Sequence, residues 1–352
     1  MKNKDNKKNK KAVQANPDDY KVMGVPSEEL FSTIIYKELE DSCNQAFTEY
    51  ENAVLANPDD YEVYCDWGEE LKILALIKTG QEAEDLYNKA FEKYERAVHI
   101  NPDYYTAFYC WGNFLYDLAR IKAGEEADDL YNQAIEKYNR AIQINSDYHE
   151  SFNNWGISLY CLAKTKIGHE SEDLFNQACG KYEKVIQEIP DDFTALFYWG
   201  NALVALARIK TGEEADDLYS KAIEKYNRAI QIYPDLSEAH YNWGNTLYNL
   251  AETRTVKDAE NLYYLACEKY ERAVNIKPDF HVAFHNWGNA LVALARIKTG
   301  QEADDLYEQA FEKYERAAQI KPDNYEDFFY DWGIDFGSFA VTQTAKEEDL
   351  YN

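Results

Sequence analysis

The sequence lacks the features that are typical of exported proteins, membrane-spanning proteins and proteins stabilised by a structural metal. It has no uninterrupted apolar run of about 18 residues and no apolar segment after Met1 of the kind found in signal peptides. Its six cysteines are scattered and include no C-x-x-C pair, which argues against a zinc framework. We therefore expect a reduced, soluble, cytoplasmic protein that does not insert into a membrane.

Motifs for catalysis and cofactor binding are also missing. No glycine-rich phosphate loop follows a strand-like segment, and there is no G-x-S-x-G motif and no EF-hand glycine spacing. His281 and His285 could lie on one face of a helix, but no glutamate follows His281 and no third metal ligand is evident. We expect ordinary polar histidines and predict a protein that is not an enzyme, with no cofactor and no metal.

Acidic residues far outnumber basic ones, 64 against 37, and the net charge is -27. The first eleven residues carry six lysines against Asp5, so the rest of the chain carries -32. A body this acidic repels phosphate groups, which argues against nucleic acid and against anionic lipid surfaces as partners. We expect a charged partner to be basic.

Tryptophan-glycine pairs recur at a fixed interval along the chain. The distance between successive tryptophans is 44 residues five times and then 45. The seven positions are Trp67, Trp111, Trp155, Trp199, Trp243, Trp287 and Trp332. A constant period of this length predicts a solenoid of stacked units rather than two or three globular domains.

This period divides the chain into four regions. Residues 1–15 form a basic tail that we expect to be disordered, and residues 16–57 a degenerate N-terminal capping unit. Residues 58–321 contain six 44-residue units, and residues 322–352 form a partial C-terminal unit or a capping helix. The six units are 58–101, 102–145, 146–189, 190–233, 234–277 and 278–321.

The unit at 102–145 has the pattern of two amphipathic helices, because its apolar residues recur at three- and four-residue steps. Gly124 separates the two halves, and we expect it to be the C-cap of the first helix. No segment alternates strictly between polar and apolar residues, so we predict an all-α fold. We also expect the tryptophans to be buried core residues.

Glycine recurs at one position of the first helix of each repeat, and alanine recurs at one position of the second helix. Gly112 lies inside the first helix of its unit, where glycine costs about 1 kcal/mol relative to alanine. Ala134 provides a small side chain on the second helix. We expect a close backbone approach between the two helices to offset the cost of the glycine.

The order of these residues resembles the signature of the tetratricopeptide repeat (TPR) over about residues 40–340. The matching positions are Phe108, Trp111, Gly112, Leu115, Ala134, Tyr138 and Ala141, followed by a closing Pro-Asp in most units. The units are ten residues longer than the 34-residue form, and their W-G-x-x-L-x-x-L-A pattern resembles the cytosolic domain of the plant-type mitochondrial import receptor. The resemblance implies a right-handed superhelix of helical hairpins whose first helices line a concave, peptide-binding groove.

The groove positions of that family map onto fixed distances from each tryptophan, and here they are occupied mostly by asparagine and tyrosine. The candidate binding residues are Tyr109, Asn113, Tyr116, Asn154, Phe197, Asn201, Tyr241, Asn242, Asn245, Tyr248, His285, Asn286 and Asn289. None of them is basic, whereas TPR proteins that clamp a terminal carboxylate place lysine and arginine in the groove. We therefore do not expect a carboxylate clamp.

Two interpretations of the asparagines remain open. Each amide offers a donor and an acceptor that could pair with the backbone of an extended peptide, or the amides could merely solvate an exposed helix face. The tyrosines could likewise form the groove floor or belong to the core. The acidic residues at each inter-helix turn (Glu125, Glu126, Asp128 and Asp129 in one unit) fit the helix dipole, with a calcium or basic-partner site as the alternative.

From these features we predict a non-catalytic protein-interaction scaffold. Its groove is expected to bind an extended or helical, basic segment of another protein. The alternative is a structural protein that assembles with itself through end-to-end or groove contacts.

Overall fold

The computed structural model describes residues 28–322, and within this range the chain consists of thirteen α-helices and contains no strand. The prediction of an all-α fold built from helical hairpins is confirmed. The chain divides into two compact units, one up to Cys110 and one from Trp111 onward. The predicted tail at 1–15 and nearly all of the predicted C-terminal unit lie outside the described residues.

Each 44-residue repeat contains two helices, and a single long helix, α1 (Glu28–Ala56), precedes them. The first helices are α2 (Tyr61–Leu76), α4 (Tyr105–Ala119), α6 (His149–Thr165), α8 (Phe193–Ile209), α10 (Ser237–Ala251) and α12 (His281–Ile297). The second helices are α3 (Gly80–Ile100), α5 (Gly124–Ile144), α7 (Gly168–Glu188), α9 (Gly212–Ile232), α11 (Val256–Ile276) and α13 (Gln301–Ile320).

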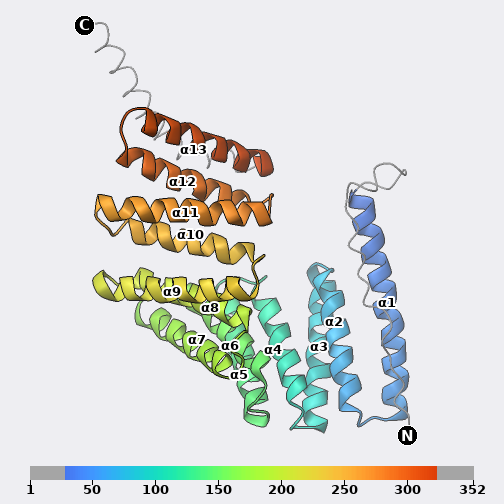
Figure 1. The fold of residues 1–352 in the computed structure, drawn as a ribbon. Helices are drawn as coiled ribbons and strands as arrows, with labels where there is room; N and C mark the ends of the chain where they lie inside the picture. The colour runs from blue at the N-terminus through green and yellow to red at the C-terminus, as the bar shows by residue number, and fades with distance from the viewer. Residues whose placement is uncertain (1–27, 323–352) are drawn as a thin grey trace, which may run out of the picture. The chain divides into compact units, whose positions relative to one another are not determined.

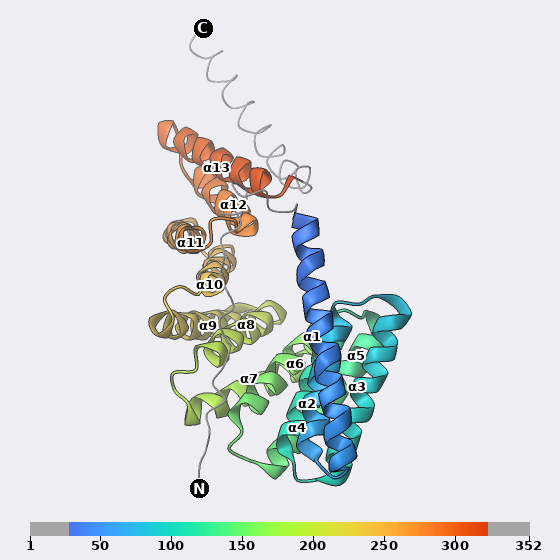
Figure 2. The same cartoon turned by 90° about the vertical axis from the view of Figure 1, so that its right-hand side faces the viewer.

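In the second compact unit, the two helices of a repeat pack against each other and then against the next repeat. Helix α8 packs on α9, α9 on α10, and α10 on α11, and the same alternation continues through α13. Figures 1 and 2 both show α8 to α13 following one another in chain order. The first helices α8, α10 and α12 also contact one another directly from repeat to repeat.

The glycine between the two helices does not cap the first helix, contrary to our expectation. Helix α4 ends at Ala119, and Gly124 is the first residue of α5. Its φ of +63° is in the left-handed region that glycine adopts at little cost, and the same conformation recurs in five repeats. Val256 replaces this glycine in the repeat at 234–277, where the turn is closed by a hydrogen bond from the Thr255 hydroxyl to Asp258 instead.

The glycine inside each first helix makes room for an aromatic ring rather than for a backbone. A Cβ atom added to Gly200 would lie 2.6 Å from Cε1 of Tyr226, a side chain that is only 1% exposed. The equivalent tyrosines of all six repeats are the largest fully buried side chains of the described chain. The close approach that we predicted therefore exists, but its partner is the tyrosine ring of the second helix.

The tryptophans are less buried than we expected. Trp199 is half-buried, and the Nζ atom of Lys225 lies 4.4 Å from the ring centroid, a cation–π geometry. A lysine takes the same position over Trp67, Trp111, Trp155, Trp243 and Trp287. Burial lowers the pKa of one of these lysines, Lys181. The tryptophan thus seals the edge of each hairpin, and the tyrosine fills its centre.

His240 occupies a position of α10 that is phenylalanine in several other repeats, such as Phe152 and Phe284. The side chain is 7% exposed, and its Nε2 atom lies 3.2 Å from the carbonyl oxygen of Pro234. Burial lowers the pKa of His240, the hydrogen bond to Pro234 partly opposes this effect, and the nearby cations Arg272 and Lys269 lower the pKa further. The imidazole is therefore held in its neutral form.

We expect opposite effects from alanine at two helical glycines. Gly200→Ala should lower the unfolding free energy by about 1–3 kcal/mol, because the added methyl group meets the Tyr226 ring. Gly180→Ala, inside α7 where a Cβ would meet nothing within 4 Å, should raise it by about 0.5–1 kcal/mol through helix propensity. Urea denaturation of both variants measures the pair, and a stabilised Gly200→Ala would contradict the proposed packing.

Replacing His240 should change how stability depends on pH. Because its pKa is lower in the folded state, the unfolded chain binds the proton more readily, and stability should decline as pH falls below about 6.5. His240→Phe removes this group, so its stability relative to the wild type should improve steadily between pH of about 7 and about 5. Denaturation midpoints across this range provide the measurement, and a difference independent of pH would contradict the buried neutral histidine.

Candidate functional site: the first-helix surface

All thirteen predicted binding residues lie on first helices, on α4, α6, α8, α10 and α12, and all are half-buried. Tyr109 belongs to the first compact unit, and the other twelve residues belong to the second. Their role in ligand binding stays a prediction. Their geometry, however, decides which of their polar atoms are still available.

The asparagine two residues after the tryptophan connects neighbouring repeats. The Oδ1 atom of Asn201 accepts a hydrogen bond of 2.7 Å from the hydroxyl of the buried Tyr226. It accepts a second one of 2.8 Å from Nδ2 of Asn242 in the next repeat. The same pair of bonds is made at Asn113, with Tyr138 and Asn154, and at Asn245, with Tyr270 and Asn286.

These bonds correct our two interpretations of the asparagines. The amides do not merely solvate a helix face, because one oxygen satisfies a core hydroxyl and an amide of the following repeat. That oxygen is also not free to accept from a peptide. Within the described part of the chain, the Nδ2 group of Asn245 donates to no protein acceptor, so the groups left for a ligand here are donors.

One repeat lacks an acceptor at this position. At 146–189, Ile157 stands where four repeats have the accepting asparagine and the 58–101 repeat has Glu69, and the repeat after it has Tyr198 in place of the donating asparagine. The hydroxyl of the buried Tyr182 consequently has no hydrogen-bond partner among the residues that the structure describes. Acceptor and donor are lost together, as expected if they form one linked pair.

The tyrosines separate into the two classes that the sequence left open. Those of the second helices, such as Tyr138 and Tyr226, are buried in the core. Tyr116, Tyr160 and Tyr248 on the first helices are half-buried and lie on the predicted groove face. Burial raises the pKa of Tyr116 and of Tyr160 above the ordinary tyrosine value.

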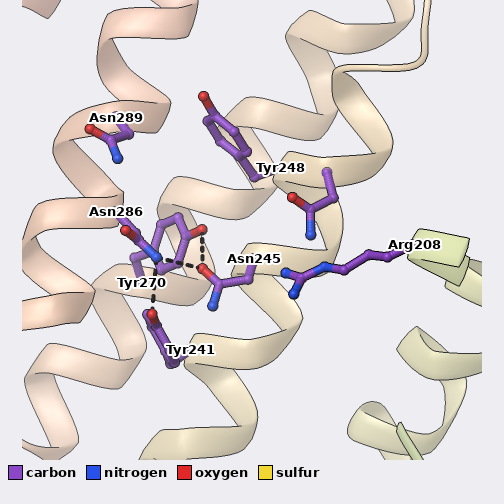
Figure 3. A pocket seen from close by; sticks show the side chains of 8 residues that line it. Arg208, Tyr241, Asn245, Tyr248, Tyr270, Asn286 and Asn289 are labelled. Carbon is purple, nitrogen blue, oxygen red and sulfur yellow. Dashed lines mark hydrogen bonds between the residues drawn. The ribbon is translucent and has the colours of Figure 1, made fainter. Parts of the chain in front are cut away.

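A pocket of about 280 Å³ lies between α8, α10 and α12 and collects five of the predicted residues (Figure 3). Its lining residues are Arg208, Tyr241, Asn245, Tyr248, Asn249, Tyr270, Asn286 and Asn289. Figure 3 shows the Arg208 side chain extending from α8 toward Asn245. Sequence reasoning missed Arg208 and Asn249, because both lie at the C-terminal ends of their helices, beyond the positions inferred from the family.

The protein's own cations pair with part of the acidic edge. Lys166 contacts Asp128 of the preceding repeat at 2.8 Å and Glu170 of its own repeat at 3.7 Å. Partial burial alone would raise the pKa of Asp128, but hydrogen bonds from Lys166 and Thr165 hold it below its usual value. The same link to the preceding repeat joins Lys78 to Glu40, Lys210 to Glu172, Arg254 to Asp216 and Lys298 to Glu260.

Neither the acidic edge nor the histidine pair gathers ligands for a metal. Among the described residues, no group of three His, Cys, Asp or Glu side chains could hold one. His285 instead lies with Nδ1 3.3 Å from Oδ1 of Asn286 and with its ring against Tyr314. Across residues 28–322, none of the helices is both long and apolar enough to cross a membrane.

Two stretches of the chain, residues 40–154 and 233–331, match the family described as plant specific mitochondrial import receptor subunit TOM20. Together they cover more than half of the sequence. The chain belongs to this family. The resemblance inferred from the W-G-x-x-L-x-x-L-A pattern is therefore confirmed, although the family match extends a few residues beyond the described structure.

The solved structure of one TPR repeat-containing protein shares the fold at low sequence identity. The C-terminal part of a TPR repeat-containing protein from Cytophaga hutchinsonii is 13% identical with a TM-score of 0.54, covering 84% of this chain and 96% of that one. PilF from Pseudomonas aeruginosa is 13% identical with a TM-score of 0.49, covering 77% and 99%. No curated protein sequence matches the chain significantly.

The hydrogen bonds of the buried tyrosine hydroxyls predict that the same substitution, tyrosine to phenylalanine, affects stability differently in two repeats. Tyr226→Phe removes the donor to Asn201 and should lower the unfolding free energy by about 0.5–1.5 kcal/mol. Tyr182→Phe removes a buried hydroxyl that has no partner in the described range 28–322, so it should leave stability unchanged or increase it. Denaturation of the two variants in parallel measures the difference, and equal losses would show that the asparagine bond contributes nothing.

Proposed function

We propose that this chain is a non-catalytic receptor that binds a segment of another protein along the first helices of its second compact unit. The segment is extended or helical and carries a net positive charge. Membership of a family described as an import receptor subunit supports a protein ligand. The pocket that gathers five predicted residues from neighbouring repeats is the observation that carries the proposal.

The chemistry of the pocket suits a polypeptide backbone. Asparagine amide groups follow one another from repeat to repeat, and the Nδ2 group of Asn245 is a donor that a peptide carbonyl could accept from. The rings of Tyr241 and Tyr248 add flat, half-buried surfaces of the kind that contribute strongly to protein interfaces. Neither feature depends on a particular ligand side chain.

The positive charge of the segment is inferred from the chain as a whole. A net charge of -27 produces a field that speeds the approach of cationic segments, and salt screens this field over a distance of about 8–10 Å. The field acts on the encounter, whereas the amides and tyrosines hold the bound chain. Raising the salt concentration should therefore slow association far more than it speeds dissociation.

Two tyrosines on opposite sides of one hairpin test the binding surface. Peptides selected from a random library on the full chain should bind Tyr248→Ala at least about ten-fold more weakly, because an interface tyrosine commonly contributes that much. Tyr264→Ala is the matched control, since Tyr264 lies on α11, is 42% exposed and borders a different, outer pocket. Titration calorimetry measures both, after thermal melts establish that each variant is folded.

A loss of binding in Tyr264→Ala with full binding in Tyr248→Ala would place the site on the outer face and refute the proposal. Self-association, the alternative drawn from the sequence, stays a prediction. Light scattering over a range of protein concentrations distinguishes the two, because a receptor keeps a constant mass and a self-assembling protein does not.

A further inference from the structure

Arg208 places a positive charge, unpaired within residues 28–322, in a pocket whose other lining residues are uncharged. It is the one charged residue among the eight that line the pocket between α8, α10 and α12. Within the described residues its guanidinium makes no ion pair, in contrast to Arg254, which binds Asp216 at 2.7 Å. Its charge acts instead on tyrosines, among them Tyr160 and Tyr219.

Two amide groups of the pocket are hydrogen-bond donors without an acceptor. Among the residues that the structure describes, the buried Nδ2 atom of Asn249 has no hydrogen-bond partner. Asn245 has its oxygen engaged by Tyr270 and Asn286, which leaves its own Nδ2 group to donate. A guanidinium and two amide groups, none of which donates to a protein acceptor within residues 28–322, therefore line one pocket. An unpaired buried donor costs free energy that a suitable ligand would recover.

We propose that this pocket binds a carboxylate, carried by an aspartate or glutamate side chain within the bound segment. A carboxylate is an acceptor only, and a guanidinium binds it through two parallel hydrogen bonds. The assignment rests on the proposed function, because it names one residue class in the segment that the groove receives. It differs from a clamp for a chain terminus, since the predicted groove face continues beyond the pocket, to Asn201 and Asn113 on one side.

This subsite is compatible with a segment that is basic overall. The steering field responds to the net charge of the segment over the Debye length, whereas the pocket contacts a single side chain. No carboxylate is among the lining residues of the pocket, and two carboxylates of the adjoining helices are already used, because Asp216 binds Arg254 and Glu252 accepts a hydrogen bond from Tyr263. A ligand carboxylate would therefore meet the charge of Arg208 without a competing acid from the protein.

The equivalent positions two repeats earlier provide an internal control for this pocket. Arg120 stands at the position of Arg208, but Ile157 and Cys161 replace Asn245 and Asn249. The Arg120 guanidinium lies 5.8 Å from the ring centroid of Tyr116. The cation is present there without the amide donors, so Arg120 should contribute nothing comparable to carboxylate binding.

The experiment uses the full chain and a small probe, N-acetyl-glutamate N-methylamide, with the glutamine analogue as the neutral control. Side-chain NMR signals of arginine Nε–H and asparagine amide groups are followed during titration. The glutamate probe should shift the Arg208 and Asn249 signals saturably, and it should bind at least about five-fold more tightly than the glutamine analogue. Arg208→Gln and Asn249→Ala should each abolish this preference, whereas Arg120→Gln should preserve it.

Equal affinity for the two probes would overturn the subsite, as would an equal loss in Arg120→Gln and Arg208→Gln. N-acetyl-glycine presents its carboxylate at a chain end, and if it bound more tightly than the glutamate probe, the assignment to a side chain would be wrong. Arg208 is exposed, so its replacement should not affect folding, which a thermal melt verifies.

The small probe also separates this inference from the proposed function. If a selected peptide requires Tyr248 but binds equally with glutamate or glutamine at every position, the receptor function stands and the subsite is refuted. If the probe binds through Arg208 while no peptide binds the first helices, the carboxylate chemistry stands and the receptor function is refuted.

Discussion

The contact between a buried tyrosine of the second helix and a glycine of the first is the constraint on which the rest of each repeat depends. Any side chain at Gly200 would overlap the ring of Tyr226, so the ring sets how closely the two helices can lie. Once the ring is in the core, its hydroxyl must find an acceptor, because an unpaired buried hydroxyl is unfavourable. The asparagine one residue after the glycine supplies that acceptor in four of the six repeats.

The same asparagine connects core packing to the binding surface. Its oxygen also receives the amide of the next repeat, as Asn201 does from Asn242, so neighbouring first helices are linked by a hydrogen bond on the predicted groove face. In the 58–101 repeat Glu69 takes over the role and accepts from Tyr94. The binding surface is thus built largely from groups that the fold already positions, and the atoms left over are mostly amide donors.

Charge is distributed unevenly over this acidic protein. Lysines and one arginine at the inter-helix turns bind carboxylates of the preceding repeat and hold successive repeats together at that edge, as Lys210 does with Glu172. The Glu172 pKa is lowered by the hydrogen bond from Lys210, although the exposure of this pair limits what it contributes to stability. The first helices α8, α10 and α12 carry few charges, which is why the single cation of Arg208 determines the electrostatics of its pocket.

The periodic pattern of the sequence was sufficient to predict the helices, the repeat and the family. A pattern such as Trp111-Gly112 followed by Leu115 indicates which face of a helix is buried. It could not tell which ring fills the space above the glycine, and so it assigned Trp199 to the core that Tyr226 occupies. It also placed Asn245 on the groove face but could not reveal that its oxygen is already bound, since the donors come from residues 25 and 41 positions away. Distances between atoms on different helices depend on how the helices pack. Arg208 and Asn249 line the same pocket as a consequence of that packing.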